Sequence, residues 1–254
     1  MKMQTLFDLS GKTAIVTGCN TGLGQGMAVA LADAGADIVG VNRSDASATR
    51  AGVEATGRRY VDVAADLAST RDIPGIVAAA LAAFGRIDIL VNNAGIIRRA
   101  DALDFTESDW DDVVNVNLRT AFFLAQAVAR QFVAQGGGGK IVNIASMLSF
   151  QGGIRVPSYT ASKSGVLGLT RLLACEWAKR GINVNAIAPG YMETSNTVAL
   201  RADANRNRAI LERIPADRWG TPADLAGAVV FLASAASDYV HGHTLAVDGG
   251  WLAR

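Results

Sequence analysis

Apolar residues along the chain gather in short runs that alternate with longer segments in which they recur every three to four residues. The short runs are rich in β-branched residues and end at glycine, asparagine or proline, a pattern typical of buried strands. Strands are expected at 13–17, 36–42, 59–65, 87–91, 140–145, 182–188 and 244–250. Helices are expected at 25–34, up to Phe84, and at 106–135, 157–179, 195–214 and 222–233. This alternation predicts an α/β fold with a doubly wound parallel sheet flanked by helices.

No repeat, low-complexity tract or linker interrupts the 254 residues, so one domain over 1–254 is expected. Segment 191–215 differs from its surroundings because it is polar, arginine-rich and compatible with a helix between two strong core elements. It is either a mobile lid over a substrate or an ordinary surface helix.

Composition narrows the function classes. Half of the residues are apolar and 19% are charged, and the net charge of +1 gives no electrostatic case for binding nucleic acid or a membrane surface. Cys19 and Cys175 form no disulfide framework, and no signal peptide or membrane-spanning run is visible. We therefore expect a cytoplasmic protein. His241 and His243 have no cysteine nearby, and no metal is predicted.

The first strand runs directly into Gly18-Cys-Asn-Thr-Gly-Leu-Gly24, and a helix follows. Glycines let the backbone approach a pyrophosphate, and a helix N-terminus offers free N–H groups to it. Strand, glycine turn and helix in this order favour a dinucleotide site over a turn without a ligand. The candidate cofactor contacts in the turn are Gly18, Asn20, Thr21, Gly22 and Leu23.

The second strand ends at Asn42-Arg43, where an NAD enzyme carries an acidic residue for the adenosine ribose. Without a carboxylate a 2′-phosphate is not repelled, and Arg43 can pair with it. Asn42 can still hydrogen-bond a bare ribose. The cofactor is therefore NAD or NADP, with NADP at least tolerated.

Small and polar residues follow three further strands at their carboxyl ends, where the strands of a doubly wound sheet form a crevice for ligands. Asp66 is placed to accept from an adenine amino group or to cap the next helix. The further candidate cofactor contacts are Asp66, Leu67, Asn93, Ala94, Gly95, Pro189 and Gly190.

A hydroxyl, a phenol and an ammonium form the candidate catalytic set. Ser146 ends the fifth strand, and Tyr159 and Lys163 lie one turn apart on the helix that Pro157 opens. A free phenol has a pKa near ~10, and a nearby ammonium lowers it, so Tyr159 can exchange a proton with a substrate oxygen. Ser146 can hydrogen-bond the same oxygen, and a cofactor must carry the hydride.

Asn117 lies inside the helical pattern of 106–135, where asparagine is disfavoured because its side chain competes for backbone hydrogen bonds. It either bends the helix or organises a water beside Lys163.

Several motifs occur together over nearly the whole chain. They are Thr-Gly-x-x-x-Gly-x-Gly at 17–24, Asn-Asn-Ala-Gly at 92–95, Asn117, Ser146, Tyr159-x-x-x-Lys163 and Pro-Gly-x-x-x-Thr at 189–194. The chain thereby resembles the short-chain dehydrogenase/reductase family. The resemblance implies a Rossmann fold and a homotetramer. It also implies that Tyr159 is the general acid/base, that Lys163 binds the nicotinamide ribose, that Asn117 holds a relay water and that Thr194 contacts the carboxamide.

Segments 92–99, 146–159 and the C-terminal end are similar to a group within this family that acts on sugar acids. The carboxylate of a sugar acid pairs favourably with an arginine. Arg98, Arg99 and Arg155 are candidates for that contact, with Ser146, Met147 and Tyr191 as further candidate substrate contacts. Two other functions stay open. One is reduction of a β-ketoacyl group on an acyl carrier protein, and the other is dinucleotide sensing without turnover.

Overall fold

The computed structural model describes residues 3–254 and contains, within them, one parallel sheet. Its strands are β1 (Thr13–Thr17), β2 (Asp37–Asn42), β3 (Tyr60–Ala64), β4 (Ile89–Asn92), β5 (Gly139–Ile144), β6 (Ile182–Pro189) and β7 (Thr244–Val247). They lie in the order β3-β2-β1-β4-β5-β6-β7, and every neighbouring pair is parallel. The predicted fold class is confirmed.

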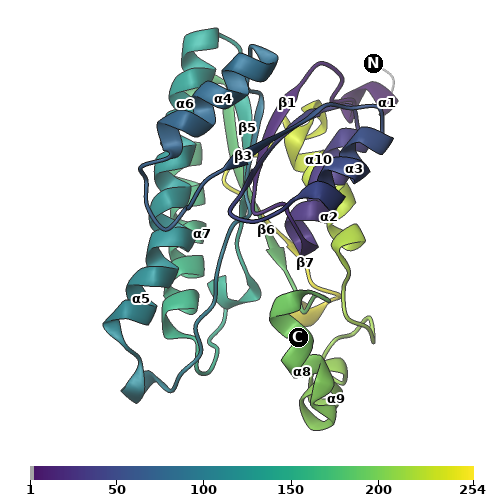
Figure 1. Cartoon of the computed structure of the whole chain (residues 1–254). Coiled ribbons are helices and arrows are strands. Elements are labelled where there is room, and N and C mark those ends of the chain that lie inside the picture. The colour runs from purple at the N-terminus through teal and green to yellow at the C-terminus, as the bar shows by residue number, and fades with distance from the viewer. Residues whose placement is uncertain (1–2) are drawn as a thin grey trace.

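Helices cover both faces of the sheet (Figure 1). They are α1 (Met3–Leu6), α2 (Gly22–Asp33), α3 (Ser47–Ala55), α4 (Ile73–Phe84), α5 (Glu107–Val114), α6 (Ala121–Gln135), α7 (Pro157–Trp177), α8 (Val198–Ala202), α9 (Ala204–Leu211) and α10 (Ala226–Ala233). The helices α2, α3 and α10 cover one face, and α4, α6 and α7 cover the other. Within residues 3–254 no helix is both long and apolar enough to cross a membrane.

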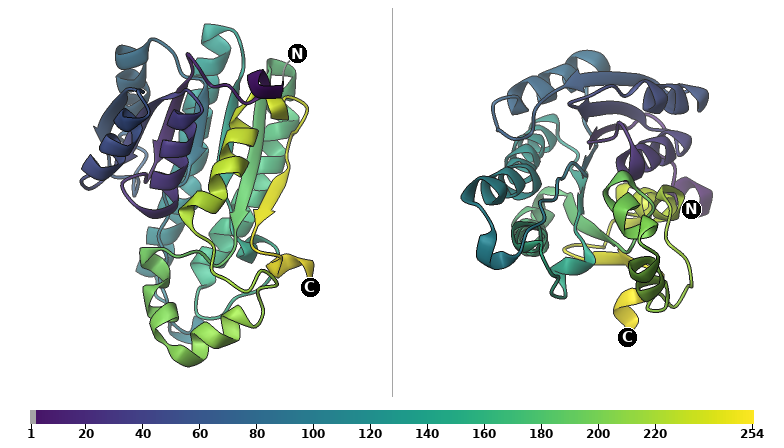
Figure 2. Two further views of the ribbon diagram at one scale, coloured as in Figure 1. Left: turned by 90° about the vertical axis from the view of Figure 1, so that its right-hand side faces the viewer. Right: turned by 60° about the horizontal axis from the view of Figure 1, so that its bottom comes forward.

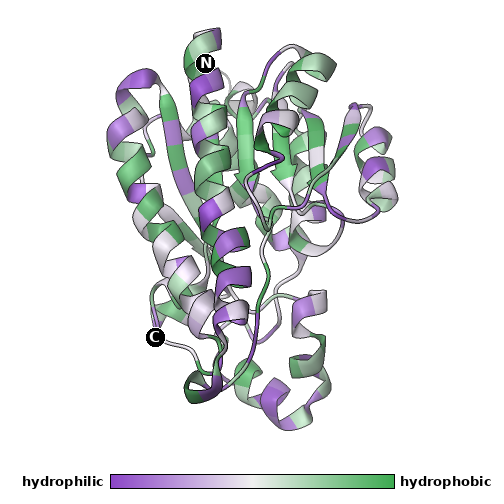
Figure 3. Ribbon diagram, turned by 60° about the vertical axis from the view of Figure 1, so that its left-hand side comes forward, coloured by the Kyte–Doolittle hydropathy of each residue, from purple (hydrophilic) through white to green (hydrophobic). Residues whose placement is uncertain are grey.

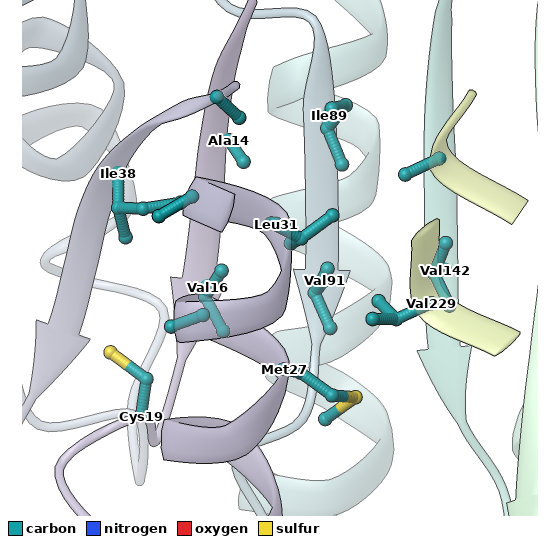
Figure 4. Packing of buried hydrophobic residues seen from close by; sticks show 14 of the residues in the cluster. Ala14, Val16, Cys19, Met27, Leu31, Ile38, Ile89, Val91, Val142 and Val229 are labelled. Carbon is teal, nitrogen blue, oxygen red and sulfur yellow. The ribbon is translucent and has the colours of Figure 1, made fainter. Parts of the chain in front are cut away.

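The core consists of two apolar clusters separated by the sheet. Val16 and Val91 face α2 and α10 and pack with Met27 and Val229, as Figure 4 shows. Ile15 lies between Ala14 and Val16 in β1 and points to the other face of the sheet, into the cluster under α4 and α6. Because both faces of the central strands are covered, these strands are buried along their whole length, whereas the outer helices carry hydrophilic and hydrophobic bands (Figure 3).

The sheet reverses its direction of strand addition at β1, which lies between β2 and β4. A crevice forms at the carboxyl ends of the strands at such a point. The helices α8 and α9 project beyond this edge of the sheet (Figures 1 and 2). The single helix expected over 195–214 is divided, because the Asp203 carboxylate accepts from the Asn205 and Arg206 N–H groups and caps α9 as a separate helix.

Candidate active site

The glycine turn between β1 and α2 is fastened to the end of β4 by side chains. The Thr17 hydroxyl accepts from the N–H groups of Asn93 (3.0 Å) and Ala94 (2.9 Å), and the Asn93 amide donates to the carbonyls of Thr17 and Gly18. Gly18 has a φ of +62°. The Thr21 side chain does not cap α2, so the first-turn N–H groups are left to a ligand.

We expect Gly24→Ala to abolish dinucleotide binding. A Cβ at Gly24 would overlap the carbonyl oxygen of Gly18 and the amide of Asn93, and it would come within 2.9 Å of the Cys19 Cα. The turn must then move away from the phosphate position. Calorimetric titration with NADP measures the loss, and Gly75→Ala is the matched control because its Cβ would enter open space. Unchanged affinity in Gly24→Ala would contradict the assignment of this turn.

A cavity of about 350 Å³ opens at the carboxyl ends of β1, β2, β4 and β5. The predicted cofactor residues that line it are Gly18, Asn20, Thr21, Gly22, Leu23, Asn42, Arg43, Asp66, Leu67, Asn93, Ala94, Gly95, Tyr159, Lys163 and Thr194. Pro189 and Gly190 are not among its walls, and Gly190 instead packs closely against Asp248. Sequence reasoning missed Val41, Ser44, Ala65, Ile96, Val116, Ile144, Ser195 and Asn196. Most of these follow or adjoin a predicted contact, and that adjacency was the available signal.

One end of the cavity contains the residues that follow β2. Arg43 is exposed and has no ion-pair partner within residues 3–254, and the Asn20 amide donates to the Ser44 hydroxyl at 3.0 Å. Asn42 is buried, and its amide nitrogen is already bonded within the protein, to Tyr60 and Asp62. At this end of the cavity, the unpaired positive charge among the described residues is therefore that of Arg43.

Ser146, Tyr159 and Lys163 meet beside this cavity. Ser146 follows β5 and Tyr159 lies in the first turn of α7, and the Ser146 side chain is close enough to the phenol to lower its pKa. The Lys163 Nζ is buried, lies 5.7 Å from the centre of the Tyr159 ring, and donates to the Ile144 carbonyl at 2.6 Å. The β5 backbone thus holds the ammonium next to the phenol.

Burial dominates the pKa values of the Tyr159 phenol and the Lys163 ammonium. It raises the pKa of Tyr159, while the Ser146 hydrogen bond and the charge of Arg99 act in the opposite direction. Burial also lowers the pKa of Lys163 to about 8. The sequence led us to expect an ammonium at Lys163 to lower the pKa of Tyr159, and the structure differs on both counts. The net shift is upward, and the cation that acts on the phenol is Arg99. Tyr159 is therefore a protonated acid at neutral pH.

Asn117 lies in a π-helical turn, Asn115–Thr120, that joins α5 to α6 and interrupts the predicted helix. Its side chain accepts from the Ile96 N–H at 2.8 Å and donates to the Ile96 carbonyl at 2.9 Å. A further bond runs to the Ser162 hydroxyl at 3.3 Å. The amide therefore fixes the loop after β4 to the catalytic helix, and the relay water stays a prediction.

The three candidate arginines have different surroundings. Arg98 pairs with Asp109 (3.3 Å) and Asp112 (2.9 Å), and Arg155 pairs with Asp101 (3.2 Å). Arg99 has no carboxylate partner within residues 3–254. It donates to the Asn196 carbonyl at 3.3 Å and lies close enough to Tyr159 to affect its pKa. Of the three, Arg99 is the guanidinium available to a carboxylate at the site.

The predicted substrate contacts Met147 and Tyr191 belong to a small apolar cluster that anchors segment 191–215. Met147 is buried with Ile210, and Tyr191 packs edge-on against Trp219, with ring centres 5.4 Å apart. Trp251 lies on the other side of Tyr191, at 4.7 Å. Met147, which follows Ser146 in the chain, is thus packed against the segment that is either a lid or an ordinary surface helix.

A glycine turn and a Ser-Tyr-Lys set at the switch point of a parallel sheet define an oxidoreductase that uses a dinucleotide. Comparison with known families agrees with this class, since the family model described as "Enoyl-(Acyl carrier protein) reductase" matches residues 18–252. The chain belongs to the short-chain dehydrogenase/reductase family of NAD(P)-dependent oxidoreductases, and the resemblance found in the sequence is confirmed.

Similar proteins cover nearly the whole chain. The 2-dehydro-3-deoxy-D-gluconate 5-dehydrogenase of Escherichia coli (strain K12) is 66% identical over 98% of both sequences, and that of Bacillus subtilis (strain 168) is 57% identical over 98% of this chain and 97% of its own. A crystal structure from Agrobacterium tumefaciens with bound NADP, provisionally assigned as a 2-deoxy-D-gluconate 3-dehydrogenase, has a TM-score of 0.93 and 59% identity, covering 98% of this chain and 99% of that one. A gluconate 5-dehydrogenase from Burkholderia cenocepacia in complex with NADP and tartrate has a TM-score of 0.94 and 41% identity over all of both chains.

Proposed function

We propose that this protein transfers a hydride between NAD(P) and a hydroxyl or keto group of a sugar acid of the 2-dehydro-3-deoxy-D-gluconate or 2-deoxy-D-gluconate type. The observation that carries the proposal is Arg99, which has no carboxylate partner within residues 3–254 and lies, like Ser146, close enough to Tyr159 to lower its pKa. The names of the similar proteins support the same substrate class.

The residues present fit a dinucleotide. Because Gly24 has no side chain, the turn can fold closely on itself and leave room for a pyrophosphate. The first turn of α2 has no side-chain cap, so its N–H groups can bind that pyrophosphate. Arg43 and Ser44 would hold a 2′-phosphate, Asp66 and Leu67 would border adenine, and Thr194 would contact the carboxamide. When bound, the cofactor supplies or accepts the hydride.

Proton transfer falls to the protein. Tyr159 donates its phenolic proton to the oxygen of the keto substrate in reduction and takes it back in oxidation, while Ser146 holds the same oxygen by a hydrogen bond. Lys163 binds the nicotinamide ribose and passes protons onward, with a relay water beside Asn117. The lowered pKa of Lys163, about 8, lets that ammonium exchange protons near neutral pH.

Substrate capture combines Arg99 with segment 191–215. The Arg99 guanidinium donates hydrogen bonds to the substrate carboxylate on the side of Tyr159 while remaining in contact with the Asn196 carbonyl. The segment then closes as a lid over the sugar acid and excludes water. This joint contact favours a small anionic substrate over a neutral carbonyl compound.

Homotetramer assembly and a cytoplasmic location are also part of this proposal. Apolar side chains stand partly exposed on neighbouring helices, namely Trp110 on α5, Phe123 and Val133 on α6, and Leu172 on α7. Burial of this face against a second copy would remove them from water. The free thiols of Cys19 and Cys175 suit a reducing compartment.

Initial rates with the purified protein test the proposal. We expect turnover of 2-dehydro-3-deoxy-D-gluconate or 2-deoxy-D-gluconate with both NAD and NADP forms of the cofactor, measured by nicotinamide absorbance. A β-ketoacyl thioester is the comparison substrate, and we expect its turnover to be at least about a hundredfold slower, since it lacks the carboxylate that Arg99 binds. Turnover of the thioester alone would leave the family intact and overturn the substrate class. Cofactor binding without any turnover would indicate a sensor.

A further inference from the structure

A polar cluster, in which Cys19, Asn42 and Tyr60 are buried and Asp62 is exposed, lies next to the part of the cavity that follows β2. The Asn42 amide nitrogen donates to the Asp62 carboxylate (2.9 Å) and to the Tyr60 hydroxyl (3.1 Å), and it lies 3.6 Å from the Cys19 sulfur. The Tyr60 hydroxyl in turn donates to Asp62 at 3.1 Å. Gly40 makes this possible, because a Cβ there would overlap the Tyr60 hydroxyl.

This cluster fixes which way the Asn42 amide points. A carboxylate only accepts hydrogen bonds, so Asp62 must face the amide NH₂ and would repel the amide oxygen. Burial raises the pKa of the Tyr60 phenol, with Cys19 and Asp62 adding to that rise, and burial also raises the pKa of the Cys19 thiol. Tyr60 is therefore protonated at neutral pH, where its hydroxyl donates to Asp62.

No hydrogen-bond donor among the described residues reaches the amide oxygen of Asn42. Within residues 3–254 this oxygen is buried and has no hydrogen-bond partner, and Asn42, which is 4% exposed, belongs to the cavity wall. An unpaired buried acceptor costs about 1–3 kcal/mol, so a donor supplied by a ligand is worth more here than at an exposed oxygen. The adenosine ribose of a dinucleotide carries such donors in its hydroxyl groups.

We propose that Asp62 is a positioning residue for cofactor selection, which holds the Asn42 amide with its oxygen toward the adenosine ribose and its nitrogen away from it. Asn42 then accepts from a ribose hydroxyl as an acidic residue would, without the charge that repels a 2′-phosphate. It offers no donor to that phosphate either, which is left to Arg43 and Ser44. The result is an enzyme that tolerates both cofactors. This inference rests on the dinucleotide site proposed above.

Asp62→Asn tests it, because an asparagine at 62 can accept or donate and lets the Asn42 amide turn round. We expect the ratio of the NADH and NADPH dissociation constants, measured by nucleotide fluorescence without any sugar acid, to shift three- to tenfold toward NADPH. Asp45→Asn is the matched control, since it removes a carboxylate that follows Arg43 and Ser44 in the chain and accepts from the Ser47 hydroxyl rather than from Asn42. An equal shift in both variants would mean that charge alone is responsible, and would overturn the proposal.

The second arm places Asp62→Asn in an Asn42→Ala background. With no amide to orient, the substitution should change the ratio less than twofold, whereas a full shift there would also overturn the proposal. If Asp62→Asn does not fold, Asp62→Ser replaces the carboxylate by a group that likewise both donates and accepts. Wild-type protein that binds neither nucleotide would instead remove the proposed function, so the two failures are distinguishable.

Discussion

Replacing Tyr159 by phenylalanine is expected to lower kcat for sugar-acid oxidation and reduction by at least about a thousandfold, because it removes the acid/base group. Phenylalanine keeps the ring, whose centre lies 5.7 Å from the Lys163 Nζ, and loses only the hydroxyl. The dissociation constant for NADPH should therefore change by less than about threefold. Steady-state rates and fluorescence titration measure the two effects separately.

The protonation of Tyr159 gives this prediction a pH dependence in the wild type. Burial raises the phenol's pKa, so the phenol is protonated at neutral pH and is ready to donate a proton. Reduction should proceed at neutral pH and fall as the pH rises through that pKa, and oxidation should show the opposite limb. Near-normal activity in Tyr159→Phe would remove the catalytic assignment.

Arg99→Leu is expected to raise KM for a sugar acid by about ten- to a hundredfold, the range for losing a hydrogen bond to a charged group. Its NADPH affinity should stay within about threefold. Arg98→Leu is the matched control, because Arg98 is neutralised by Asp109 and Asp112 and should change KM by less than about threefold. Equal effects of the two substitutions would show that net charge, rather than contact, attracts the substrate.

The same variant has a second readout. The positive charge of Arg99 lowers the pKa of Tyr159, so removing it should raise that pKa further. Oxidation needs the phenolate, and its rising limb should therefore move to higher pH in Arg99→Leu. A loss of packing alone would raise KM without moving the limb, and this separates the two roles.

Most of the fold was predictable because the central strands β1, β2 and β4 are buried along their whole length and are rich in apolar residues. The helix α3 was missed, since only Thr49 and Val53 on it are buried and its apolar stripe is too short to stand out. The division of 195–214 was missed for a different reason. Asp203 is one polar residue among many there, and its role as a cap is visible only in the structure.

The candidate site was predictable as a set of strand-end residues, but the partners of those residues were not. Arg98, Arg99 and Arg155 are equivalent in sequence, and only folding shows that two of them face aspartates. The cluster behind Asn42 depends on pairing between β2 and β3. Its one sequence signal was Gly40, a glycine inside a buried strand, which often marks the close approach of another group.

The π-helical turn Asn115–Thr120 makes part of this site depend on residue count as well as residue identity. Such a turn contains an extra residue relative to an α-helical path, and each residue rotates a helix by about 100°. Deleting one residue between α5 and α6 would allow a continuous α-helix. It would also rotate α5 relative to α6 and so change the direction in which the Asn117 side chain points relative to Ile96. Substitutions alone cannot reproduce that change of phase. Insertions and deletions in this turn, unlike substitutions, can therefore remove or restore the hydrogen bonds by which Asn117 connects the loop after β4 to α7.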